Sequence, residues 1–168
     1  EHVLGARFAD ANFFVREDVK KPLEAYRDGL KTLIFQTKLG SLLDKSNRML
    51  KLGAELAHML GFKDVMEVKS LARAVYLAKA DLTTQMVTEM TSLQGIIGRE
   101  YALRSGEAPE VAAAIGEQYQ PVPQTKIGLV VALSDRIDSL VGLFAAGVSP
   151  SGAKDPFGLR RAAIGTVQ

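Results

Sequence analysis

The chain has 168 residues, of which 47% are hydrophobic and 24% charged, as in an ordinary globular protein and unlike a disordered tail. It contains no cysteine, which excludes disulfides, thiolate catalysis and cysteine-ligated zinc, and its net charge of +2 is too small to indicate nucleic-acid binding by itself. No apolar run reaches the about 18 residues of a membrane span, and no signal peptide is visible. The chain starts at Glu1 and stops at Gln168 within a predicted helix, so we expect an excised domain or processed fragment.

The first 28 residues are more charged than the rest and are predicted to be a lead-in segment that packs on the main domain. Phe8, Phe13 and Phe14 are the side chains of this segment that need burial. Residues 29–148 are predicted to form one helical domain, because strand signals are weak there. Residues 149–168 are predicted to be a loop followed by the start of an adjoining helix.

Apolar residues from Phe35 to Leu60 keep helical spacing, which predicts one helix face that ends near Gly61. His58 is expected in the last turn of that helix, where a histidine can interact with free carbonyls. Asp44 precedes Arg48 by four residues, the favourable order for an ion pair within a helix.

A second helix is predicted over residues 70–89, with a break near Thr91 and a further helix through residue 101. A new helix starts after Pro109 and ends before the prolines at 121 and 123, which exclude its continuation. The next helix runs from Thr125 to Gly147. Its side chains predicted to face the core are Ile127, Val130, Val131, Ile137, Val141 and Phe144.

The segment 150–161 combines a glycine-bearing loop, the pair Asp155-Pro156 and two adjacent arginines. Asp155 is predicted to cap a helix whose first residue is Pro156, since proline lacks the N–H that would go unpaired at that position. Lys154 would then lie just before a helix N-terminus, with Arg160 and Arg161 about one turn further on. This arrangement predicts a grip on phosphate, with structural ion pairs to neighbouring carboxylates as the alternative.

Four segments, in order along nearly the whole chain, resemble the β subunit of the bacterial-type, two-subunit glycyl-tRNA synthetase. They are FQTKLGSLLDK (35–45), LAKADLTTQMVTE (77–89), LQGIIGREYA (93–102), and VALSDRIDSL (131–140) taken together with PSGAKDPFGLRR (150–161). The chain departs from the family in a shorter loop at 122–126 and in Gly158, where relatives carry alanine. A glycine inside a helix there would cost about 1 kcal/mol relative to alanine.

The resemblance implies an all-α fold, an HD-domain-like helical bundle with a degenerate metal site. HD proteins hydrolyse phosphate esters with a divalent metal held by histidines and aspartates. Asp81 and Asp135 match the aspartate positions, but Ala80 stands where the paired histidine belongs, and the chain's only histidines are His2 and His58. No catalytic residue and no metal ligand is therefore assigned. As the alternative, Asp81 pairs with Lys79 or Arg136, while Asp135 and Asp138 face solvent or a basic neighbour.

The resemblance further implies a non-catalytic domain that binds or orients tRNA within the glycine–tRNA ligase β subunit. The implied partners are tRNA(Gly), contacted at its acceptor end, and the α subunit, which holds the glycine-activating site. The whole enzyme uses ATP and Mg²⁺, and no cofactor is expected in this part. The implied compartment is the cytoplasm, with the plastid as an alternative. A spacer that touches no RNA is the second hypothesis, and a metal phosphohydrolase is the third.

The candidate RNA-binding residues are basic and predicted to lie on helix faces or at the start of the last helix. For Lys38, Lys45 and Arg48, the competing interpretation is a solvent-exposed helix face that binds no RNA. Arg136 is predicted to reach either Asp81 or RNA. Tyr101 and Tyr119 are the only weak candidates for stacking on a base, and core packing is the favoured role of both. The candidates are Lys154, Arg160, Arg161, Lys38, Lys45, Arg48 and Arg136.

Overall fold

The computed structural model describes residues 2–168, with side chains from residue 7 onward, and it confirms an all-α fold with one small hairpin. The elements are α1 (His2–Asp18), η1 (Leu23–Thr32), β1 (Ile34–Gln36), β2 (Gly40–Ser41), α2 (Leu42–Met59), α3 (Val65–Leu77), η2 (Ala80–Thr83), α4 (Gln85–Glu89), η3 (Thr91–Leu93), α5 (Ile96–Arg104), α6 (Pro109–Glu117), α7 (Lys126–Ala145) and α8 (Leu159–Val167), where η marks a 3₁₀ helix.

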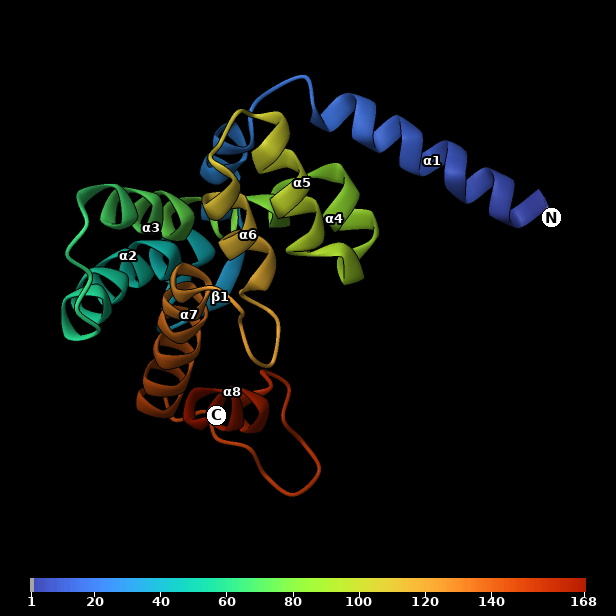
Figure 1. Cartoon of the computed structure of the whole chain (residues 1–168). Helices are drawn as coiled ribbons and strands as arrows, with labels where there is room; N and C mark the ends of the chain where they lie inside the picture. Colours follow the sequence, from blue (N-terminus) through green and yellow to red (C-terminus); the bar gives the residue numbers. More distant parts are fainter. Residues whose placement is uncertain (1) are drawn as a thin grey trace.

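The body of the molecule is a bundle in which α2, α3 and α6 pack against α7 and against one another. Figure 1 shows α1 projecting from one side of this body and α8 lying across the lower end of α7. The core between the helices is filled by aliphatic side chains such as Met49, Leu77, Ile115 and Val131, none more than 1% exposed. No helix in residues 2–168 has the length and apolar character needed to cross a membrane.

The predicted helix from Phe35 to Leu60 begins later than its apolar spacing suggests. Phe35 lies in the antiparallel hairpin β1–β2, and Gly40 adopts a positive φ of 82° at its turn. Ser41 then caps α2 by accepting a hydrogen bond from the Asp44 backbone, while the Asp44 carboxylate bonds back to Ser41. This capping box fixes the helix start at residue 42, and the predicted end near Gly61 is confirmed.

The predicted helix over residues 70–89 is two helices, because α3 ends at Leu77 and α4 starts at Gln85. Two polar side chains hold the break. Thr84 caps α4 through the Val87 N–H, and the buried Asp18 at the end of α1 accepts the backbone N–H groups of Gln85 and Met86 at 2.9 and 3.0 Å. The break therefore depends on a contact between segments far apart in the chain.

The later helices match their local signals well, with one error on α7. α6 starts at Pro109, and α7 is capped by Thr125 and ends before Gly147, as predicted. Val141 and Phe144 were predicted to face the core but are 66% and 53% exposed. At this end of α7 the buried apolar side chain is Leu143 instead.

The lead-in segment packs only in part. Phe14 lies against the core, whereas Phe8 and Phe13 are 75% and 56% exposed on the projecting α1. The 3₁₀ helix η1 runs across the predicted boundary at residue 28 and buries Leu23 and Leu30. The division into 1–28, 29–148 and 149–168 stays a prediction.

Candidate nucleic-acid interface

The C-terminal segment presents three exposed basic side chains, those of Lys154, Arg160 and Arg161. A tight turn at 151–154, closed by hydrogen bonds between the backbones of Ser151 and Lys154, holds the lysine before the helix. Both arginines lie in the first turn of α8. Within the described residues, none of the three forms an ion pair with an acidic side chain.

The N-cap residue of α8 is Gly158 and the helix starts at Leu159, so the predicted positions of Asp155 and Pro156 as N-cap and first helical residue are wrong. The Asp155 carboxylate accepts the backbone N–H groups of Leu159 and Arg160 at 2.8 and 2.9 Å. Gly158 adopts a left-handed conformation with a φ of 66°, which ends the turn that contains Pro156. Glycine is thus favoured at position 158, and the expected helical penalty does not apply.

This cap changes how an anion could be held at the start of α8. The hydrogen bond from the Arg160 N–H is the main cause that lowers the pKa of Asp155, so the carboxylate is charged at neutral pH. It occupies N–H groups that a phosphate would otherwise use. A phosphate at this end must therefore be bound by the side chains of Lys154, Arg160 and Arg161.

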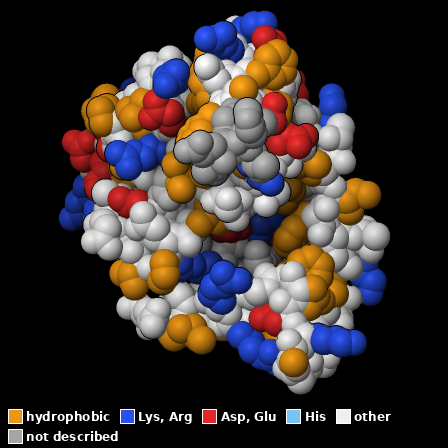
Figure 2. Space-filling view, turned by 90° about the vertical axis from the view of Figure 1, so that its right-hand side faces the viewer, with side chains coloured by type: hydrophobic (Ala, Val, Ile, Leu, Met, Phe, Trp, Pro, Cys, Tyr) orange, Lys and Arg blue, Asp and Glu red, His pale blue; other side chains and the backbone are white. Residues whose placement is uncertain are grey.

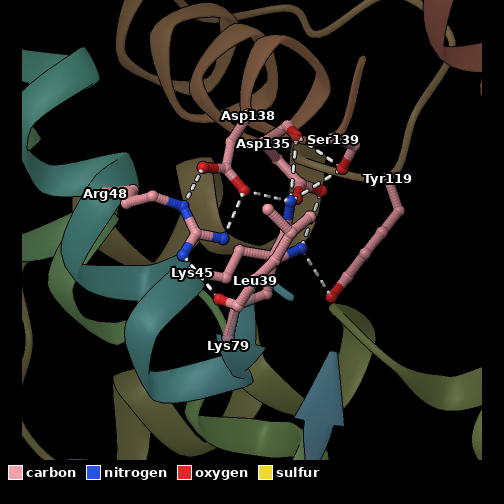
Figure 3. Close-up of polar contacts among 8 residues, drawn as sticks. All are labelled: Leu39, Lys45, Arg48, Lys79, Tyr119, Asp135, Asp138 and Ser139. Atoms are coloured by element: carbon pink, nitrogen blue, oxygen red, sulfur yellow. Dashed lines mark hydrogen bonds and ion pairs between the residues drawn. The ribbon is translucent and has the colours of Figure 1, made fainter. Parts of the chain in front are cut away.

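Lys45, predicted on an exposed RNA-facing surface, lies instead in a buried network between α2 and α7 (Figure 3). Its ammonium contacts one carboxylate oxygen each of Asp135 and Asp138, at 2.9 and 3.1 Å, and the Ser139 hydroxyl at 2.7 Å. The side chain is 4% exposed. We therefore assign Lys45 to this network and not to an RNA contact.

Arg48 belongs to the same network, and its predicted ion pair with Asp44 is not formed. The guanidinium donates to both carboxylate oxygens of Asp138, at 2.6 and 3.1 Å, and to the Leu39 carbonyl at 2.8 Å. Asp44 is committed to the capping box of α2. The bidentate contact explains the choice, because it offers more and better-oriented bonds than a single pair along the helix.

Lys79 completes the network. In the sequence it was considered only as a partner of Asp81, and its contact with Asp135 was not predicted. Its ammonium contacts Asp135 at 2.8 Å and the Tyr119 hydroxyl at 3.1 Å (Figure 3). Burial alone would raise the pKa of Asp135, but the ammonium groups of Lys79 and Lys45 outweigh it and hold the pKa well below its usual range. The prediction that Asp135 and Asp138 face a basic neighbour is confirmed.

Asp81 is fully buried and pairs with neither Lys79 nor Arg136. One carboxylate oxygen accepts the Gly95 N–H at 2.6 Å, and the other has no hydrogen-bond partner among the described residues. Burial raises the pKa of this carboxyl. No group of three or more histidine, aspartate or glutamate side chains in the described chain is placed to hold a metal ion, and we derive no chemistry through one.

Two further basic candidates donate to backbone carbonyls. Lys38 is exposed and reaches the Ala146 carbonyl at 3.0 Å, at the C-terminus of α7. Arg136 donates to the carbonyls of Gly165, Gln120 and Pro121. It does not pair with Asp81, one of its two predicted partners, but ties α8 and the loop after α6 to α7.

The aromatic and histidine candidates occupy mostly structural positions. Tyr101 is 3% exposed and donates to the Asp18 carboxylate at 3.1 Å, which supports the favoured core role. Tyr119 lies at the edge of the buried network, next to Lys79. His58 is in the last turn of α2, as predicted, and the side chain of His2 lies outside those described.

Comparison with known proteins identifies the family. The sequence profile of the family described as "Glycyl-tRNA synthetase beta subunit" matches residues 1–168. The glycine–tRNA ligase β subunits of Desulforudis audaxviator, Clostridioides difficile and Pseudomonas putida (strain GB-1) are 51%, 47% and 43% identical, over 98%, 98% and 100% of this chain. The chain spans about a quarter of the length of these relatives. It therefore belongs to the glycyl-tRNA synthetase β subunit family.

Proposed function

We propose that this chain is a non-catalytic part of a glycine–tRNA ligase β subunit that binds and orients tRNA during the formation of glycyl-tRNA. The observation that carries the proposal is the exposed basic cluster of Lys154, Arg160 and Arg161, which we call the basic segment. These side chains lack acidic partners in the described residues, so their charges are available to a ligand.

The chemistry of the basic segment suits RNA. A-form RNA is bound mainly through its phosphates, its 2′-hydroxyls and its unpaired ends, and arginine binds phosphate with two parallel hydrogen bonds. Two adjacent arginines on one helical turn, with a lysine on the preceding loop, can follow a curved backbone. Lys38 and Arg48 keep partial exposure and lie on the hairpin and α2, where they would add weaker contacts.

The partners follow from the family and are part of the proposal. They are tRNA(Gly), contacted at its acceptor end, and the α subunit of the same enzyme. ATP and Mg²⁺ would serve the complete ligase. We further propose that the bundle is HD-like, with Asp81 and Asp135 at the positions of former metal ligands and Lys45 and Lys79 supplying positive charge beside Asp135.

A spacer function is the second candidate, and one observation favours it. Four of the seven candidate RNA-binding residues bind carboxylates or carbonyls of the protein itself, namely Lys45, Arg48, Arg136 and Lys38. In that case the domain would set the distance between neighbouring parts of the subunit without touching RNA.

Salt-dependent binding separates the two functions. The affinity of the chain for tRNA(Gly) is measured at about 50 and 200 mM salt, for the wild type, for Arg160→Ala/Arg161→Ala and for the control Lys63→Ala/Lys69→Ala. The control removes the same charge from exposed positions near and on α3. Each lost phosphate contact should reduce the salt slope by about 0.7–0.9 in the arginine variant and leave the control unchanged. Equal slopes in all three proteins, or no binding, would favour the spacer.

A further inference from the structure

A cleft of about 690 Å³ lies between the C-terminal segment and the loop after α6. Figure 2 shows a hollow between the body of the molecule and its lower part, with basic side chains along its lower edge. Arg136 connects the two walls of the cleft, because its guanidinium binds the Gly165 carbonyl on one wall and the carbonyls of Gln120 and Pro121 on the other. The volume falls in the range of about 300–1,000 Å³ that is usual for small-ligand sites.

The walls are rich in side-chain amides. The residues that line the cleft include four glutamines from three parts of the chain, Gln94, the neighbours Gln118 and Gln120, and Gln168, beside Tyr119. Each glutamine amide carries a hydrogen-bond donor and an acceptor. The edge of a nucleobase also carries donors and acceptors, so the two can form complementary hydrogen bonds.

Gln118 adds an unsatisfied group to this wall. Its side chain is 2% exposed, and its amide nitrogen donates to the carbonyls of Ala78 and Ile115 at 2.5 and 2.9 Å. Its carbonyl oxygen has no hydrogen-bond partner among the described residues. Because this oxygen is buried, the exposed residues Gln94, Gln120 and Gln168 are the ones whose amides a base in the cleft could reach.

The rim supplies an aromatic ring and a cation. Phe157 lines the cleft, is 42% exposed and packs edge-on against Phe35, with ring centroids 6.3 Å apart. Arg161 lines the same cleft and is exposed. Proteins usually recognise single-stranded nucleic acid with an aromatic ring that stacks on a base and a cationic group that binds the adjacent phosphate.

We propose that this cleft binds one unpaired nucleotide of an RNA strand, with the base between Phe157 and the glutamine amides and the 5′ or 3′ phosphate on Arg161. The inference rests on the proposed tRNA-binding function and adds a single-strand subsite to it. Lys154 and Arg160 would contact the duplex backbone, and the cleft with Arg161 would receive a base that has left the stack.

The experiment uses two RNA hairpins that share one stem, one blunt and one with a four-nucleotide overhang carrying 2-aminopurine. Binding is measured with the wild type, with Phe157→Ala and with the control Phe144→Ala, which removes a ring that is 53% exposed on α7, outside the cleft. We expect the wild type to bind the overhang RNA more tightly than the blunt RNA and to quench the 2-aminopurine. Phe157→Ala should weaken overhang binding by about 10-fold, abolish the quenching and leave blunt binding unchanged.

The outcomes distinguish the two proposals. Equal binding of blunt and overhang RNA, with no quenching, overturns the cleft proposal and leaves RNA binding standing, whereas no binding of either RNA overturns both. If a free nucleoside monophosphate competes as well as the overhang RNA does, the cleft is a site for mononucleotides, and the proposal of an RNA subsite is overturned. If Phe157→Ala does not fold by circular dichroism, Gln94→Ala/Gln168→Ala replaces it, since both residues lie at the cleft surface.

Discussion

Replacing Lys79 by methionine tests whether the buried network stabilises the fold. The substitution keeps the length of the side chain but removes an ammonium that is 2.8 Å from Asp135 and 3.1 Å from the Tyr119 hydroxyl, in a side chain 4% exposed. Removal of one partner from a buried ion pair costs about 3–5 kcal/mol. Because Asp135 keeps its contact with Lys45 at 2.9 Å, we expect the lower end, about 3 kcal/mol.

Urea unfolding followed by circular dichroism at 222 nm measures this loss, with Lys38→Met as the matched control. Lys38 is exposed and makes one bond to a carbonyl, so its replacement should cost less than about 1 kcal/mol. The double variant Lys79→Met/Asp135→Leu should be more stable than the sum of its single variants predicts, by about 1–3 kcal/mol, because both single variants lose the same Lys79–Asp135 contact. Additive effects, or a cost for Lys79→Met equal to that of the control, would refute the assigned role of the network.

Three further predictions concern pH, a helix cap and packing. The pKa of Asp135 in the folded protein is below its ordinary value of 3.8, so the unfolded chain binds more protons in acid. The stability that Asp135 contributes is therefore present above about pH 4 and should be lost as the pH falls below 4. In urea unfolding measured at several pH values, Asp135→Asn should flatten this dependence. Asp155→Ala removes the carboxylate that accepts the first N–H groups of α8 and should destabilise this helix, seen as faster amide exchange confined to residues 159–168; exchange as slow as in the wild type would contradict this role. Gly98→Ala places a methyl group 2.8 Å from Ile115 and 2.9 Å from Asp81 and should cost about 1–3 kcal/mol, whereas a thermal midpoint equal to the wild type would show that these neighbours yield freely.

The signals that sequence analysis used successfully act within a few residues of each other. Thr125 caps α7, Pro109 starts α6, and Gly147 follows the end of α7, as their positions in the chain predict. Asp155 is a partial case, since its carboxylate accepts the first N–H groups of α8 but the N-cap residue is Gly158 and the helix starts three residues later than predicted. Such features are readable because caps and turns depend on local backbone groups.

The errors in the helix prediction have a common origin. The apolar spacing of Phe35 and Leu39 continues that of α2, yet the positive φ of Gly40 and the capping box at Ser41 turn this part into a hairpin. Over residues 70–89, Asp18 supplies hydrogen bonds to the start of α4 from another part of the chain. The spacing of apolar residues indicates which side chains can be buried, but it does not indicate where a helix begins or ends.

The sequence by itself determined the all-α fold class and the family, since both rest on composition, local patterns and motifs that lie in order along the chain. Only the tertiary structure decided which charges are free. Lys45 and Lys154 are both ordinary lysines in the sequence, but the first is enclosed by Asp135 and Asp138 and the second lies exposed on a loop. The partners of Lys45 come from a helix some 90 residues away. A buried charge takes the partners that packing brings to it, so its role cannot be read from its neighbours in the chain.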